Sequence, residues 1–121
     1  MRKAKEMAER KEIAERIAEE MSKQINEWGF EVIVVGSLRK GSSEPKDVDL
    51  LVIAWEKEEI EKCSRLLVEK FGKRAQWIES HEQSLGWVRH VDRVSGQMET
   101  DIFYIGLDHH WFPPQIYLSR R

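Results

Sequence analysis

Apolar side chains recur every three or four residues along the first quarter of the chain, which is the spacing of one face of an α-helix. These positions are Ile13, Ile17, Met21, Ile25 and Trp28. Charged residues fill most of the remaining positions, as on a solvated face. We expect one amphipathic helix from Lys3 to Trp28, ended by Gly29, with its apolar face in the core. A helix that binds a partner is the alternative.

Short segments rich in Val, Ile and Leu predict the strands. We expect strands at Phe30–Val35, Asp47–Ala54, Ala75–Ser80, Trp87–Val94 and Gln97–Ile105, and a second helix at Glu56–Phe71. The two residues Ser95 and Gly96 between the last two strands are typical of a tight hairpin turn. The order α-β-β-α-β-β-β predicts an α+β fold, in which a mixed β-sheet has its helices packed on one face.

Length and composition indicate one domain, residues 1–121, with a heavily charged surface. Charged residues make up 35% of the chain but the net charge is only −2, so a polyanion would need a local basic patch. A single cysteine, Cys63, excludes an intramolecular disulfide and falls on the apolar face of the second helix. No apolar run approaches the roughly 18 residues of a membrane span. The start lacks a secretory h-region, so we expect a cytoplasmic protein without a membrane partner.

Two carboxylates share one face of the second strand. Asp47 and Asp49 are two residues apart, so their side chains point the same way while Val48 points to the other face. Asp101 is a third candidate, because an aspartate inside the apolar segment "TDIFYI" is unusual without a role. Three converging carboxylates need a compensating cation, and Mg²⁺ suits carboxylate and phosphate ligands. The alternative is that each aspartate caps a turn or pairs with an arginine or lysine.

The segment before these carboxylates is suited to phosphate. Gly36 and Ser37 follow a strand and open a short helix or loop. Glycine allows close backbone approach, and the hydroxyl and free N–H groups at a helix start can bind a phosphate. Arg39 and Lys40 add positive charge nearby. A phosphate cradle next to a metal site is what phosphoryl transfer requires.

At this point a family resemblance becomes visible. The stretch "GSLRKGSSEPKDVDLLV" resembles the signature of the DNA polymerase beta-like nucleotidyltransferase superfamily, in which Gly-Ser is followed after about ten residues by Asp-hydrophobic-Asp. The basic pair after Gly-Ser is most similar to family X DNA polymerases. The flanking helices and the segment "YLSR" at Tyr117–Arg120 follow in the family's order. The resemblance implies a polymerase beta-like palm, and an enzyme of the family X type.

The resemblance also implies roles for individual residues. Asp47 and Asp49 would bind two Mg²⁺ ions, with Mn²⁺ as the alternative metal, and Asp101 would bind the catalytic ion and help activate the acceptor hydroxyl. The residues that would bind the nucleoside triphosphate are Gly36, Ser37, Arg39, Lys40 and Tyr117. A nucleoside monophosphate would pass from a (d)NTP to a hydroxyl, such as a DNA or RNA 3′ end, and pyrophosphate would leave.

Departures from the family pattern leave other functions open. Glu99 stands where these polymerases often carry an arginine, and Leu118 and Arg120 replace an aromatic residue and a glycine. We expect no thumb, fingers or lyase domain, so a partner protein would supply the thumb or the acceptor. One alternative is a minimal, antitoxin-like nucleotidyltransferase that modifies a protein or a small molecule. Another is a nucleotide-binding module without catalysis.

The remaining aromatic and basic residues have either a structural or a functional interpretation. Trp87, Arg89, Val91 and Arg93 alternate along one expected strand, as either a nucleic-acid track or a packed and solvated strand. We expect Trp55, Trp77 and Trp111 to pack against the protein rather than to stack on bases, and the pair His109-His110 to have a structural or surface role rather than to bind metal.

Overall fold

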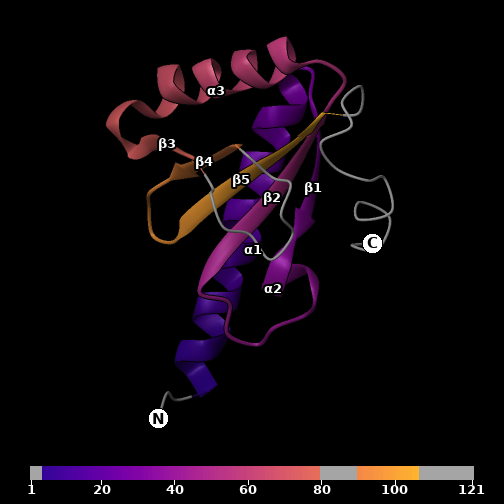
Figure 1. The fold of residues 1–121 in the computed structure, drawn as a ribbon. Helices are drawn as coiled ribbons and strands as arrows, with labels where there is room; N and C mark the ends of the chain where they lie inside the picture. Colours follow the sequence, from indigo (N-terminus) through magenta and orange to yellow (C-terminus); the bar gives the residue numbers. More distant parts are fainter. Residues whose placement is uncertain (1–3, 80–89, 107–121) are drawn as a thin grey trace.

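The computed structural model describes residues 4–79 and 90–106 of the chain. In chain order, its elements are α1 (Ala4–Glu27), β1 (Glu31–Val35), α2 (Gly36–Arg39), β2 (Asp47–Ala54), α3 (Lys57–Phe71), the 3-10 turn η1 (Gly72–Arg74), β3 (Ala75–Glu79), β4 (His90–Val94) and β5 (Glu99–Gly106) (Figure 1). The expected helices and strands are all present, and their ends shift by up to three residues. None of the helices in this described part has the length and apolarity to cross a bilayer.

The five strands form one mixed sheet in the order β1-β2-β5-β4-β3. Strands β2 and β5 pair in parallel at its centre, and the other neighbouring strands pair antiparallel. A parallel pair needs a crossover connection, which here contains α3, β3 and β4. The predicted mixed sheet is therefore confirmed, and its central parallel pair brings segments that are some fifty residues apart side by side.

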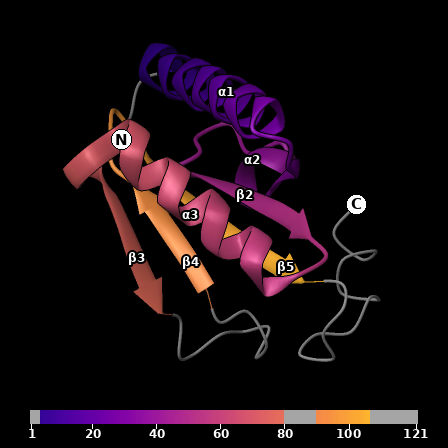
Figure 2. The same ribbon diagram turned by 90° about the horizontal axis from the view of Figure 1, so that it is seen from above.

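The two long helices pack on one face of this sheet, as predicted. Figure 2 shows α3 lying across the strands, with α1 beyond it. Ile25 of α1 and Leu67 of α3 are fully buried in the same cluster as Leu50 of β2 and Ile102 of β5. Cys63 is buried there too, in agreement with the core interpretation. Burial of these apolar side chains is the main source of stability for the fold.

Local signals explain where the helices begin and end. Gly29 has a positive φ of 97°, and the N–H of Phe30 donates to the carbonyl of Ile25, which closes the last turn of α1. At the start of α3, the Glu56 side chain accepts from the backbone N–H of Glu59, and the Glu59 side chain accepts from the backbone N–H of Glu56. These two hydrogen bonds form a capping box.

The hairpin between β4 and β5 differs from the prediction. A two-residue turn at Ser95-Gly96 would have placed Asp101 opposite His90. Instead Val94 pairs with Thr100 and Arg93 pairs with Asp101, and four residues, 95–98, lie between the end of β4 and the start of β5. The connection is anchored on η1, because the N–H of Ser95 donates to the carbonyl of Arg74 and the Arg74 side chain donates back to Ser95. Contacts outside the hairpin therefore set its register.

Two tryptophans do not pack as expected. Trp55 is 65% exposed and Trp77 is 51% exposed. Trp55 directly follows the end of β2, and Trp77 lies on β3, which is an edge strand among the strands that the structure describes. Few of the described elements lie beside either position, so these large side chains are only partly covered. Trp111 and the pair His109-His110 lie outside the described residues.

Candidate active site

The parallel pairing of β2 and β5 brings the acidic residues together on one face of the sheet. In this register Asp49 lies beside Asp101, and Asp47 lies beside Glu99. Val48 points to the opposite face and is fully buried in the core under the helices. The strand interpretation of Asp47 and Asp49 is therefore confirmed, and Asp101 joins them because its strand is their direct neighbour.

The three aspartates are close enough to share a metal ion. Asp47, Asp49 and Asp101 each offer a carboxylate oxygen, and these oxygens all lie within 4.8 Å of one another. Mg²⁺ and Mn²⁺ prefer such hard oxygen donors and leave room for phosphate oxygens. The side chain of Asp101 is 14% exposed, so charge gathered at this point is partly shielded from water. The donor set fits the metal that the resemblance implies.

Gly36 lies directly against this carboxylate cluster. Its φ is +74°, and a Cβ at this position would lie 2.2 Å from Oδ2 of Asp49. Only glycine tolerates both the backbone conformation and the close approach. The sequence suggested that this glycine makes room for a phosphate. The structure shows that it makes room for a carboxylate of the site.

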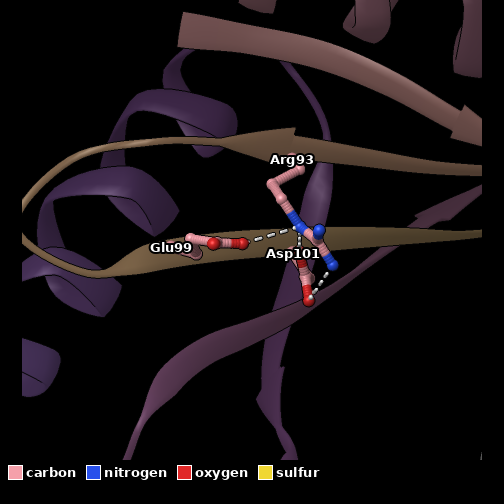
Figure 3. Close-up of polar contacts among 3 residues, drawn as sticks. All are labelled: Arg93, Glu99 and Asp101. Carbon is pink, nitrogen blue, oxygen red and sulfur yellow. Dashed lines mark hydrogen bonds and ion pairs between the residues drawn. The ribbon is translucent and has the colours of Figure 1, made fainter.

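Arg93 on β4 supplies a positive charge to the cluster. Its Nε donates to Oδ1 of Asp101 at 2.7 Å, and its Nη2 lies 3.5 Å from Oδ2 of the same carboxylate. The same Nε lies 2.9 Å from Oε2 of Glu99. Figure 3 shows the guanidinium of Arg93 between the two carboxylates. Asp101 thus has the arginine partner that the alternative interpretation requires, while all three aspartates still converge.

The pKa values reflect this concentration of charge. Burial raises the pKa of Asp47, and the negative charges of Asp101 and Glu99 raise it further, against the opposing effect of Arg93 and Lys46. The hydrogen bond to Asp101 raises the pKa of Arg93, so its guanidinium stays charged. The cluster therefore carries more negative charge than Arg93 alone balances, as expected of a cation site.

Of the expected phosphate-binding residues, Gly36 lies against the cluster, and Ser37, Arg39 and Lys40 follow it at the end of β1. Gly36 and Ser37 begin α2, and the carbonyl of Ser37 accepts from the N–H of Ser42. Arg39 and Lys40 are exposed at the end of α2. Arg39 also lines a groove between α1 and α2. Their contact with a nucleotide stays a prediction.

Some predicted features fall on segments beyond the described ranges. Tyr117, with the rest of "YLSR", lies there, and so do Trp87 and Arg89 of the suggested nucleic-acid track. Of that track, the structure describes Val91, which is buried, and Arg93, which pairs with Asp101.

The pairing of Arg93 with Asp101 was missed by the sequence analysis. Arg93 was noticed only as part of an alternating basic strand. A longer connection that pairs Val94 with Thr100 would have placed it opposite Asp101. The turn residues Ser95 and Gly96 indicated a shorter connection, and no neighbouring residue in the sequence indicated a longer one.

Comparisons with known proteins find this arrangement of elements in solved structures. No protein-family model matches the chain, and no curated protein matches it. The crystal structure of the Cid1 poly(U) polymerase matches 75% of this chain with a TM-score of 0.50 and 14% identity. A Cid1 structure described for RNA terminal uridylyl transferase activity matches 83% of it, also with a TM-score of 0.50 and 14% identity. The chain spans 29% and 30% of those two proteins, and the likeness concerns the fold.

Proposed function

We propose, from the premise that this chain has the nucleotidyltransferase fold of the DNA polymerase beta-like superfamily, that it is a metal-dependent nucleotidyltransferase. The observation that carries the proposal is the convergence of Asp47, Asp49 and Asp101, whose oxygens lie within 4.8 Å of one another. A fold alone does not define an activity, but this cluster stands directly beside the Gly36–Ser37 turn. Carboxylates and a phosphate cradle side by side are suited to phosphoryl transfer.

In the proposed reaction, an acceptor hydroxyl attacks the α-phosphorus of a nucleoside triphosphate. The new bond joins the acceptor oxygen to the α-phosphorus, the bond to the bridging oxygen breaks, and pyrophosphate leaves with its electron pair. Asp47 and Asp49 would hold two divalent ions, Mg²⁺ or Mn²⁺, together with Asp101, which would also help remove the hydroxyl proton. Such ions supply charge neutralisation and orientation for the phosphates.

The triphosphate would lie along the start of α2. We assign its β- and γ-phosphates to Gly36 and Ser37, with Lys40 and Arg39 as the cationic neighbours. Tyr117 would lie beside the sugar and base. These positions follow from the resemblance, and the adjacency of Gly36 to Asp49 supports them.

A nucleic-acid 3′ end is the acceptor we favour, with RNA to be tested first. The two Cid1 structures are of a poly(U) polymerase with RNA terminal uridylyl transferase activity. The basic pair Arg39-Lys40 still favours the family X DNA polymerase type, so a DNA primer is the second acceptor. Glu99 alone disfavours a polyanion, but Arg93 lies 2.9 Å from its carboxylate and offsets the charge.

The test is pyrophosphate release from each NTP and dNTP with Mg²⁺, measured with an RNA oligonucleotide, a primed DNA duplex or no acceptor. Asp101→Asn keeps the shape of the side chain but removes a metal ligand. We expect it to lower turnover by at least about a hundredfold, since even outer-shell partners of a metal cost ten- to hundredfold. Glu61→Gln, at an exposed position of α3, is the control for the loss of one acidic charge.

The outcomes separate the possible functions. Release that depends on RNA or DNA and is lost in Asp101→Asn supports the proposal and identifies the acceptor. Nucleotide binding without release under any condition favours a protein or small-molecule acceptor, or a binding module. Equal turnover by Asp101→Asn and Glu61→Gln would show that the site is elsewhere.

A further inference from the structure

Arg93 and Glu99 lie beside the cluster of the three aspartates. Arg93 comes from β4 and Glu99 from the start of β5, and both lie on the face of the sheet that carries the three aspartates. The guanidinium already holds both oxygens of Asp101 (Figure 3). A metal ion that used Asp101 as a ligand would therefore compete with Arg93 for the same carboxylate.

Glu99 offers Arg93 a second partner at almost no displacement. The Nε of Arg93 is 2.7 Å from Oδ1 of Asp101 and 2.9 Å from Oε2 of Glu99, so it lies between the two carboxylates. The Arg93 and Glu99 side chains are 41% and 55% exposed, whereas that of Asp101 is 14% exposed. The arginine and the glutamate thus have fewer packing neighbours to hold them than the aspartate has.

We propose that Arg93 is the counter-ion of Asp101 while the site lacks metal. When a divalent ion binds Asp101, Arg93 keeps only its ion pair with Glu99. The inference rests on the proposed function, because it assumes that Asp101 is a metal ligand. It gives Arg93 and Glu99 the role of positioning residues that set metal affinity. It also explains why an acidic residue at position 99 is compatible with an already acidic site.

Electrostatics gives the direction of each effect. A positive charge in contact with a ligand weakens cation binding, so removal of Arg93 should tighten it. Removal of Glu99 should weaken metal binding in two ways, since it deletes one negative charge and leaves Arg93 with Asp101 as its partner. The second contribution disappears when Arg93 is absent. A double-mutant cycle separates the two contributions.

The experiment measures the dissociation constant of Mn²⁺ from the loss of its free electron paramagnetic resonance signal, without nucleotide. The proteins are the parent, Arg93→Gln, Glu99→Gln and the double variant Arg93→Gln/Glu99→Gln. Arg65→Gln and Glu61→Gln are controls, because they make the same charge changes at exposed positions of α3, a helix on the opposite face of the sheet. A urea unfolding curve for each variant verifies that it is folded.

We expect Arg93→Gln to bind Mn²⁺ about tenfold more tightly than Arg65→Gln, the size of effect that a nearby unit charge produces. Glu99→Gln should weaken binding clearly in the parent and much less in the Arg93→Gln background. Arg93→Lys keeps the charge and should bind nearly as the parent does. If Arg93→Gln is unfolded, Arg93→Lys still tests the proposal. Tenfold tighter Mn²⁺ binding by Arg93→Lys than by the parent would overturn it.

Failure of this inference and failure of the proposed function look different. If the parent binds Mn²⁺ and Arg93→Gln binds it no more tightly than Arg65→Gln, the counter-ion role is wrong and the metal site stands. An additive cycle, with Glu99→Gln equally harmful in both backgrounds, also overturns the role of Glu99. If neither the parent nor Arg93→Gln binds Mn²⁺, the metal site of the proposed function is wrong, and the inference falls with it.

Discussion

The contact between Gly36 and Asp49 shows how little space the site leaves around its carboxylates. A hypothetical Cβ at residue 36 would overlap Oδ2 of Asp49 at 2.2 Å. Asp49 lies on the central strand β2, whose backbone is held in place because Val48 and Leu50 are fully buried on the opposite face. The glycine thus sets the position of a proposed metal ligand.

Gly36→Ala should therefore damage metal binding beyond its effect on stability. The positive φ alone costs an ordinary residue roughly 1–2 kcal/mol. Gly41→Ala is the matched control, because Gly41 has a φ of +84° and nothing within 4 Å of a Cβ. We expect both variants to lose stability in urea unfolding, and Gly36→Ala alone to lose Mn²⁺ binding, by about tenfold or more.

Equal Mn²⁺ binding by Gly36→Ala and Gly41→Ala would contradict this argument. It would mean that Asp49 can move away from residue 36 without leaving the metal, or that Asp49 is not a ligand.

At the scale of elements, a buried polar cluster joins α3 to the sheet. Asp92 of β4 is 1% exposed and accepts from the Ser64 hydroxyl of α3 at 3.1 Å and from the Tyr104 hydroxyl of β5 at 2.5 Å. Burial raises the pKa of Asp92, against the opposing effect of these two hydrogen bonds. Asp92, Ser64 and Tyr104 thus hold one another in place where α3 meets β4 and β5. They lie on the face of the sheet opposite the carboxylate cluster.

The raised pKa predicts how stability changes with pH. A carboxyl whose pKa is higher in the folded protein favours folding when protonated. Its contribution is complete below the unfolded value of about 3.9 and is lost as pH rises through the folded value. Asp92→Asn has nearly the same shape and does not titrate. The free energy of unfolding of the parent, measured relative to Asp92→Asn in urea, should therefore fall as pH rises from 4 to 8.

This comparison cancels most other titrating groups. Asp47 is common to both proteins, and burial raises the pKa of Cys63 to about 12, well above the range. A difference between the two proteins that stays constant from pH 4 to 8 would show that Asp92 is already ionised in the folded protein throughout.

At the scale of the whole molecule, the unbalanced charge is concentrated at one place. The net charge is only −2, yet four carboxylates lie together on the adjacent strands β2 and β5, beside Arg93 of β4. Repulsion within this group destabilises the metal-free fold. A divalent ion that binds only the folded state should remove that cost.

Metal should therefore stabilise the whole protein. At a hundred times its dissociation constant, Mg²⁺ should raise the free energy of unfolding by about 2.7 kcal/mol. Asp49→Asn should show little of this increase. The measurement is urea unfolding with MgCl₂, compared with NaCl at the same ionic strength. An equal increase in both salts, or in Asp49→Asn, would attribute the effect to screening rather than to the site.

Much of this architecture follows from local sequence pattern. The apolar spacing of α1 and α3 and the β-branched strands predicted the two long helices and the five strands in order, because helix and strand periodicity depend on near neighbours. The expected packing of Trp55 and Trp77 is not seen, since both side chains are exposed and burial depends on which elements lie beside them. The resemblance in the Gly-Ser and Asp-Val-Asp segment supplied the fold that the structure has.

By itself, the sequence determined which elements form and that Asp47 and Asp49 share a face, because side-chain alternation along a strand is a local property. Only the tertiary structure decided that Asp101 lies beside Asp49 and that Arg93 holds Asp101. Both facts depend on strand register, and register is set by contacts between segments far apart in the chain. The anchoring of Ser95 on Arg74 is one such contact, and it placed the arginine opposite the third aspartate.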